Sequence, residues 1–414
     1  MKASKALYPT KYYVRLITHL VFALFIRYFR IEKKLPSEVK KLKSPYLLVA
    51  NHVGFWDPFI IGHFLPGFIH FVSSDAAFKT KIAGFFLPRL GTIPKRKNVR
   101  DSQAVRDIAG VIQQGGNVGI FPEAVRNWAG STLPIDPSIA KLIKFLKVPV
   151  VGCKSKGMNL FNPRWSKHIR RTKVKLEYSL LLDQKQVETL SPEDIYLSLI
   201  NALRHDEIQY QRRAQQKIYS RRKAEYIGHT LFVCPECHAW DRFSSVANDF
   251  WCTSCDYRLH IDSLGFFKVM SDHKLHFDNI RDWYDWQKEW TFQYVRNLYL
   301  QQHSGLIFKD KNSLIYISNS VGDLIPAGVA DLCLYLDRIE FVFIEDGRVI
   351  QLYLKELQTI NPQVDEKLEI IHMEGSYRSV GGRPGVSGLK WEIVVNAIWQ
   401  MMGEKHKLSP YIQF

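Results

Sequence analysis

Short apolar runs alternate with stretches of helical spacing between residues 46 and 182, and this alternation restricts the fold more than any other feature of the chain. Because strands separated by helices pack as layers, the pattern predicts an α/β domain with a mostly parallel sheet. A single long helix is predicted further on, at 190–226. The predicted strands are 46–50, 69–73, 117–121, 148–153 and 173–182, and the predicted helices are 57–65, 76–88, 102–114 (capped by Ser102) and 138–147.

Polar side chains follow directly where the first predicted strand ends. The strand at 46–50 runs into Asn51 and His52, and Asp57 comes five residues after the histidine. Catalytic groups gather at strand ends in sheets of this kind. A carboxylate one short loop from an imidazole can hold its Nδ1 proton, so that the other ring nitrogen can deprotonate an alcohol. A loop histidine with no chemical role is the alternative interpretation.

Three later loops carry further polar residues. Arg96 precedes the helix predicted at 102–114, and Glu123 and Arg126 follow the strand predicted at 117–121. Guanidinium groups match phosphate bidentately, and a glutamate can fix a nearby hydroxyl or arginine. Together these residues suit a phosphorylated polar ligand, whereas each arginine alone is better explained as a solvated surface charge.

Four ordered blocks resemble those of the glycerophospholipid acyltransferases, a family that includes the 1-acylglycerol-3-phosphate acyltransferases. The resemblance covers residues 10–185 and implies an α/β acyltransferase domain with an N-terminal anchor helix. It also implies a lysophospholipid acceptor and an acyl-CoA or acyl-carrier-protein thioester as donor. The blocks are Asn51-His52-x4-Asp57, Gly91-x-Ile-Pro-Lys-Arg96, Phe121-Pro122-Glu123-x-x-Arg126 and Val148-Pro149-Val150-Val151.

The resemblance assigns roles to six residues. His52 is the expected general base, with Asp57 as its orienter, and Asn51, Arg96, Glu123 and Arg126 are the expected substrate-binding residues. The chain departs from the family pattern on the acceptor side, which puts the acceptor in question more than the reaction. The departures are Ala124 and Val125 in place of glycine and a small hydroxyl residue, Asn127 in place of serine, and Gly152 in place of proline.

The N-terminal region is basic and rich in apolar side chains. Residues 1–50 hold eleven Lys or Arg against two Glu, within a chain of net charge +17 and pI about 9.5. Residues 8–30 mix aromatic and aliphatic side chains with basic ones, which predicts an amphipathic helix lying on anionic lipid. A helix packed on its own domain is the alternative. Nucleic acid is the less expected partner, and the expected location is the cytoplasmic face of a membrane, peripheral or monotopic.

Two Cys-x-x-Cys pairs give the most specific local signal. Fourteen residues separate Cys234 and Cys237 from Cys252 and Cys255. Two thiolate pairs on tight turns at this spacing are typical of zinc ribbons, so a structural zinc is predicted at 228–264. All four positions would be filled by protein, which leaves no open site for catalysis. His238 and His260 are expected to be bystanders.

The C-terminal region, 265–414, predicts a small, mostly β domain closed by a helix at 390–401. Its layout resembles pleckstrin-homology-like domains, and a Trp-bearing helix at 282–290 precedes it. The predicted strands are 305–308, 313–317, 339–344, 348–353, 368–372 and 376–380. The remaining segments are 1–45 as a membrane-associating helical segment, 46–189 as the acyltransferase domain and 190–227 as a linking helix.

Two functions compete on these grounds. The first is a membrane-surface O-acyltransferase of the EC 2.3.1 class, which acts on a lysophospholipid or glycerol phosphate. The second is a non-catalytic, basic zinc-ribbon protein that binds nucleic acid or a protein partner. The intact block from Asn51 to Asp57 favours the enzyme, whereas Ala124 and Val125 favour the second interpretation.

Overall fold

The computed structural model describes residues 7–78, 81–95, 101–123, 125–319, 322–363 and 366–412. The chain divides into two compact units. The first unit comprises Met1–Arg164 and Arg170–Ile218, and the second comprises Trp165–Ile169 and Tyr219–Phe414.

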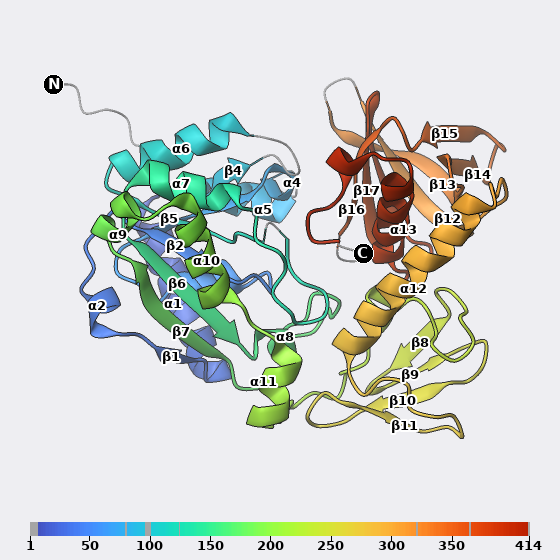
Figure 1. Cartoon of the computed structure of the whole chain (residues 1–414), viewed down its shortest axis with the longest axis horizontal. Coiled ribbons are helices and arrows are strands. Elements are labelled where there is room, and N and C mark those ends of the chain that lie inside the picture. Colours follow the sequence, from blue (N-terminus) through green and yellow to red (C-terminus); the bar gives the residue numbers. More distant parts are fainter. Residues whose placement is uncertain are drawn as a thin grey trace. The chain divides into compact units, whose positions relative to one another are not determined.

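The first unit is built on a seven-stranded sheet in the order β1-β7-β6-β2-β5-β3-β4 (Figure 1). Every neighbouring pair is parallel except β6 and β7, so the predicted mostly parallel sheet is confirmed. Two short edge strands, β1 and β4, were not predicted. The strands are β1 (Glu32–Lys34), β2 (Leu47–Ala50), β3 (Ile69–Ser74), β4 (Ile93–Lys95), β5 (Asn117–Ile120), β6 (Val150–Lys156) and β7 (Lys175–Leu182).

Helices cover both faces of this sheet. α6 (Ser102–Gln113), α7 (Ser138–Leu146) and α10 (Pro192–Leu203) share a buried apolar cluster with Leu47 and Val49 of β2. Figure 1 shows α1 (Tyr12–Phe29) on the side of the sheet away from α10. The remaining helices are α2 (Ser37–Lys40), α3 (Asp57–Gly62), α4 (Asp75–Phe78), α5 (Lys81–Arg89), α8 (Met158–Phe161), α9 (Gln184–Thr189) and α11 (Glu207–Ala214).

The N-terminal helix forms, but it is not amphipathic in the expected sense. Its inner side meets α3 through the stacked rings of Phe22 and Phe59, whose centroids are 4.7 Å apart. Its outer side is also apolar, with Ile17 58%, Leu20 55% and Leu24 70% exposed. Among the described residues, α1 is the one helix that is long and apolar enough to cross a membrane, by length and composition alone.

The predicted helix at 190–226 is wrong in its length. α10 ends at Leu203, and α11 begins at Glu207 after a break. Tertiary contacts cause the break: Thr132 accepts the backbone N–H of His205 through its hydroxyl, and the Asp206 side chain caps the new helix. Gln215 then ends α11 in the left-handed conformation.

Two smaller expectations also need correction. The helix predicted at 76–88 is two helices, α4 and α5, packed so closely that a Cβ at Gly84 would collide with the Phe78 carbonyl. The cap of α6 is Asp101 rather than Ser102, because the Asp101 carboxylate accepts the Ala104 N–H.

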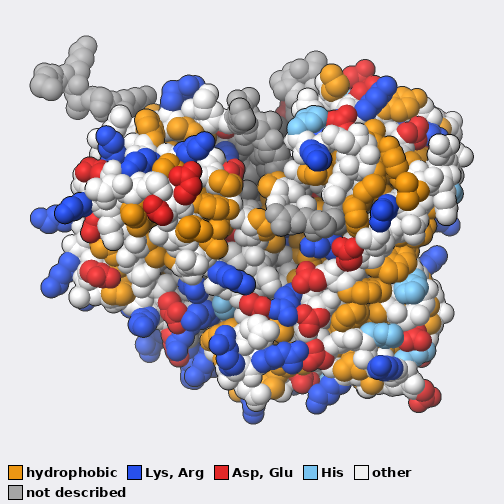
Figure 2. All heavy atoms as spheres, in the orientation of Figure 1, with side chains coloured by type: hydrophobic (Ala, Val, Ile, Leu, Met, Phe, Trp, Pro, Cys, Tyr) orange, Lys and Arg blue, Asp and Glu red, His pale blue; other side chains and the backbone are white. Residues whose placement is uncertain are grey.

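The second unit begins with a four-stranded antiparallel sheet that carries the two cysteine pairs. The long helix α12 (Ile280–Leu300) packs on it through Trp283, which is fully buried and donates its indole N–H to the Val233 carbonyl. Trp286 and Trp290 are only partly buried, and Figure 2 shows a band of hydrophobic side chains over α12. The strands of this sheet are β8 (Phe243–Val246), β9 (Asp249–Cys252), β10 (Arg258–Ile261) and β11 (Phe267–Val269), with η1 (Ile227–His229) before them.

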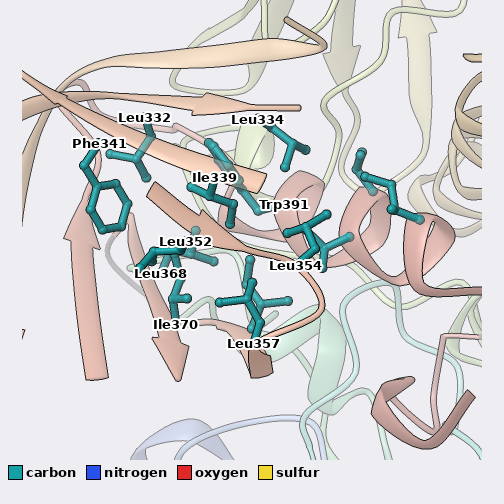
Figure 3. Close-up of a cluster of buried hydrophobic side chains, with 14 of the residues drawn as sticks. Leu332, Leu334, Ile339, Phe341, Leu352, Leu354, Leu357, Leu368, Ile370 and Trp391 are labelled. Carbon is teal, nitrogen blue, oxygen red and sulfur yellow. The ribbon is translucent and has the colours of Figure 1, made fainter. Parts of the chain in front are cut away.

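The rest of the second unit is a seven-stranded antiparallel sheet closed by α13 (Gly388–Met401). The order is β15-β14-β13-β12-β18-β17-β16, and Trp391 of α13 joins the buried cluster drawn in Figure 3. The β-rich layout and its final helix agree with expectation. The strands are β12 (Phe308–Ser318), β13 (Leu324–Leu334), β14 (Arg338–Phe343), β15 (Val349–Tyr353), β16 (Leu357–Pro362), β17 (Lys367–His372) and β18 (Gly375–Val380), with η2 (Lys405–Lys407) after α13.

A buried ion cluster ties the cysteine-bearing sheet to this second sheet. Lys390 of α13 is 2% exposed and donates to Asp241, at 2.8 Å, and to Asp310 of β12. Burial lowers the pKa of the Lys390 ammonium, but the two carboxylates raise it by more, so the net shift is upward. Because removing one partner of such a buried cluster is costly, these two parts hold together as one unit.

Candidate active site

His52 and Asp57 lie within hydrogen-bond distance at the carboxyl end of β2. The loop that follows the strand turns back into α3, whose first residue is Asp57. His52 Nδ1 is 2.9 Å from Asp57 Oδ2, and the same oxygen accepts the backbone N–H groups of Val53 at 2.7 Å and Gly54 at 2.9 Å. The carboxylate is fully buried. This geometry makes Nδ1 the donor and leaves Nε2 for chemistry.

The His52 ring is packed yet still reaches solvent. It stacks on Phe121 with centroids 4.2 Å apart, and its side chain is 20% exposed. Burial lowers the pKa of His52, the Asp57 hydrogen bond and charge raise it, and the positive charges of Arg126 and Arg164 lower it. The net shift is downward, so the imidazole is neutral at pH 7 and ready to accept a proton.

Asn51 faces the protein interior. Its side-chain oxygen accepts the backbone N–H of Ser155 at 2.8 Å, and its amide donates to the Ser155 carbonyl at 3.2 Å. Ser155 lies on the neighbouring strand β6. Asn51 therefore fixes the end of β2 against β6, which determines where His52 begins its loop.

Glu123 is buried behind the histidine. It is 1% exposed, and its two oxygens accept the backbone N–H of His52 at 2.9 Å and of Leu133 at 2.8 Å. Burial raises the pKa of Glu123 to about 8, although both backbone hydrogen bonds lower it. The expected contact of Glu123 with an acceptor stays a prediction; in the structure its carboxyl oxygens bind the backbone of the loop that carries His52 and of Leu133.

Arginines lie beside the histidine. Arg126 and Arg164 are close enough for their charges to lower the pKa of His52, and the Arg164 guanidinium donates to the Arg126 carbonyl at 2.7 Å. Arg164 also lies over the Trp128 ring, 3.8 Å from its centroid. Arg164 lies outside the four sequence blocks, so no motif pointed to it. Arg96 falls outside the described residues.

Two of the departures from the family pattern have structural roles. The backbone N–H and side-chain amide of Asn127 both donate to the His52 carbonyl at 3.2 Å, and its side-chain oxygen accepts the Gly130 N–H. Gly152 lies within β6, where a Cβ would collide with the Leu181 side chain. Val125 is buried, and Ala124 lies outside the described residues.

The four predicted metal ligands converge in the second unit. Their sulfurs all lie within 4.8 Å of one another, with 3.7 Å separating Cys234 from Cys255 and Cys237 from Cys252. A tetrahedron with metal–sulfur bonds of about 2.3 Å has edges of about 3.8 Å, so these thiolates fit zinc. His260 contacts Asp249 and His238 stacks on Trp290, so both lie outside the ligand group.

Comparison with known proteins bears on the first unit. The family model described as acyltransferase matches residues 28–156. This segment of the first unit is therefore similar to acyltransferase domains. It contains His52, Asp57, Glu123 and Arg126.

No curated protein matches the sequence. Among solved structures, the 1-acyl-sn-glycerophosphate acyltransferase PlsC from Thermotoga maritima is similar at 18% identity and a TM-score of 0.40, covering 46% of this chain and 78% of its own. The Vps36 N-terminal PH domain is similar at 14% identity and a TM-score of 0.20, covering 25% of this chain and 84% of its own. At these scores neither likeness carries a functional argument.

Proposed function

We propose that the protein is a membrane-surface O-acyltransferase that moves a fatty acyl group from a thioester to a hydroxyl of a lysophospholipid or glycerol phosphate. One observation carries the proposal. Within the segment that matches the acyltransferase family, His52 Nδ1 lies 2.9 Å from a fully buried Asp57, and the histidine ring remains partly exposed.

The dyad performs the proton transfers. His52 Nε2 takes the proton of the acceptor hydroxyl as its oxygen attacks the thioester carbonyl carbon. The new carbon–oxygen bond forms, the carbon–sulfur bond breaks, and the thiolate leaves and recovers the proton from the imidazolium. Asp57 fixes the tautomer and stabilises the imidazolium charge as it forms. No acyl-enzyme intermediate is required, because the attacking oxygen belongs to the acceptor.

The surrounding residues divide into binding and positioning groups. Arg126, together with Arg96 and Arg164, supplies guanidinium groups for the phosphate of the acceptor. Glu123 and Asn51 act through the backbone: Glu123 holds the His52 amide, and Asn51 holds the end of β2. These two residues are proposed as positioning residues rather than ligands.

The four cysteines are proposed as a structural zinc site. When bound, the metal would link the two turns of the cysteine-bearing sheet, and thiolates fill all four tetrahedral positions. Cysteines that bind metal rather than form disulfides suit a reducing compartment, which supports a location on the cytoplasmic side of the membrane. The exposed apolar side of α1 provides the membrane contact.

A product assay tests the proposal. Purified protein is incubated with isotopically labelled acyl-CoA and a panel of lysophospholipids and glycerol phosphate, and the products are identified by mass. The expected result is a labelled phospholipid from one class of acceptor, with one thiol released per product. If no acceptor in the panel gains an acyl group while the protein remains folded, the acyltransferase proposal fails.

A further inference from the structure

The loop between the two dyad residues exposes a large aromatic side chain. Phe55 lies between His52 and Asp57 and is 55% exposed, whereas Val53 and Asp57 on either side are buried. Its ring lies against those of Trp56 and Phe59. A single exposed ring is ordinary, whereas a contiguous exposed apolar surface marks an interaction site, so what adjoins Phe55 decides its meaning.

Phe55 continues the apolar surface of α1 through a chain of rings. Its centroid lies 5.1 Å from that of Trp56, which lies 6.1 Å from Phe22 and 5.8 Å from Phe25 of α1. Phe55 is also 6.5 Å from Phe59 of α3, the ring on which Phe22 stacks. The catalytic loop and the N-terminal helix are therefore joined by direct packing.

The chemistry of this surface favours a lipid bilayer over a protein. The outer side of α1 offers apolar side chains and no acidic residue along Tyr12–Phe29. Cations stand at both ends, with Lys11, Arg27 and Arg30 exposed. The broad apolar strip matches the acyl region of a membrane surface, and the cations at its ends match anionic headgroups. Binding of this kind needs no specific polar partners.

We propose that Phe55 inserts into the same lipid surface as α1, so that membrane docking and the placement of the His52 loop are one event. This inference rests on the proposed function, because it deepens how that site meets its lipid substrate. Bilayer contact would seat the dyad at the level where a lysophospholipid presents its glycerol hydroxyl. Trp56 and Phe59, packed on α1, would transmit the position of the helix to Asp57.

Fluorine NMR tests the contact directly. A trifluoromethyl-phenylalanine replaces Phe55 in the full chain, and a matched protein carries it at Phe145, a 60% exposed ring on α7. Each is placed on bicelles of phosphatidylcholine and phosphatidylglycerol. We expect a nitroxide-labelled phospholipid to broaden the signal at position 55 but not at 145, and soluble Mn²⁺ to broaden only the signal at 145.

Kinetics supply a second readout. Phe55→Ser should lower the ratio of kcat/KM on vesicle-borne lysophospholipid to kcat/KM on a monomeric short-chain analogue by about tenfold, whereas Phe145→Ser should leave it unchanged. A signal at position 55 that is as open to Mn²⁺ as that at 145, or one shielded from water without response to the labelled lipid, would overturn the inference. If Phe55 contacts lipid but the protein transfers no acyl group, the proposed function is refuted, whereas the inference that Phe55 docks on the membrane still holds.

Discussion

Substitution of Glu123 distinguishes two roles for its side chain: positioning of the His52 loop and binding of the acceptor. The side chain is buried, and its oxygens accept the backbone N–H groups of His52 and Leu133. Glu123→Ala leaves both donors without a partner, which costs about 1–3 kcal/mol each. The total of about 2–6 kcal/mol is a large share of the stability of one domain. We therefore expect Glu123→Ala to lower the denaturation midpoint of the first unit and to abolish activity.

Glu123→Gln is the sharper variant, because it keeps the shape and one acceptor oxygen. Its NH₂ group faces the second backbone donor, so a loss of about 1–3 kcal/mol is expected near pH 6. Burial raises the pKa of Glu123 to about 8 from 4.5, so stability from this group is full below pH 4.5 and is lost as pH rises through 8. Glutamine lacks that loss, so the gap between the two proteins should narrow as pH rises from 4.5 to 8 and stay constant above pH 8.

Loss of the hydrogen bond between the His52 amide and Glu123 should also slow the reaction, because this bond positions the loop that carries His52. A displacement of about 1 Å in a catalytic group can cost on the order of 10²-fold in rate. We expect Glu123→Gln to lower kcat by 10- to 100-fold, with KM for the lysophospholipid nearly unchanged. Steady-state assays with varied acceptor check this, and the control is Asp136→Asn, at an exposed carboxylate that accepts the Ser138 N–H in its own loop. A raised KM with unchanged kcat would refute the positioning role of Glu123 and would support a role in acceptor binding instead.

Two further predictions concern the dyad partner and the metal. Because the hydrogen bond and charge of Asp57 raise the pKa of His52, Asp57→Asn should lower that pKa further, move the acid limb of the kcat/KM profile to lower pH, and slow the reaction by on the order of 10²–10⁴-fold; an acid limb that does not move would show that another group sets it. Chelation, or Cys237→Ser, should remove about one zinc per chain by atomic absorption and shift the tryptophan fluorescence, to which the buried Trp283 contributes, without stopping thiol release in a detergent assay. Immediate loss of turnover in a protein whose tryptophan fluorescence is unchanged would contradict a purely structural metal.

The sequence predicted those features that depend on residues close together in the chain. An apolar run that ends in Asn51-His52 indicates a buried strand and its loop, and Asp57 is near enough in sequence for the loop to bring it back. The zinc ligands are equally local, because each pair shares one turn. The pairing of His52 with Asp57 could therefore be anticipated from the sequence alone.

The features that could not be predicted depend on contacts between residues far apart in the sequence. Glu123 meets the amide of a residue 71 positions earlier, so nothing near it in the chain indicates that its oxygens are already occupied. The break after α10 depends on Thr132, which lies in a distant loop. β13 was missed because Pro326 and Gly328 suggest a turn, whereas the structure places them at a bulge opposite Tyr316 and Ile315.

The N-terminal helix shows a related limit. The sequence predicted a helix lying on lipid and left a helix packed on its own domain as the alternative, and Phe22 does pack on Phe59. The apolar character of the other side was visible in the composition, but only the fold shows that Leu20 and Leu24 remain exposed.

The central claim, that the His52 imidazole deprotonates the acceptor hydroxyl, is tested most directly by thiol release from acyl-CoA in the presence of the accepted lysophospholipid. Wild-type protein and His52→Ala are compared at matched concentration, with circular dichroism to establish equal folding. We expect the wild-type protein to release one thiol per phospholipid formed, and His52→Ala to fall to the uncatalysed rate. Equal rates in the two proteins would contradict the assignment of His52 as the base.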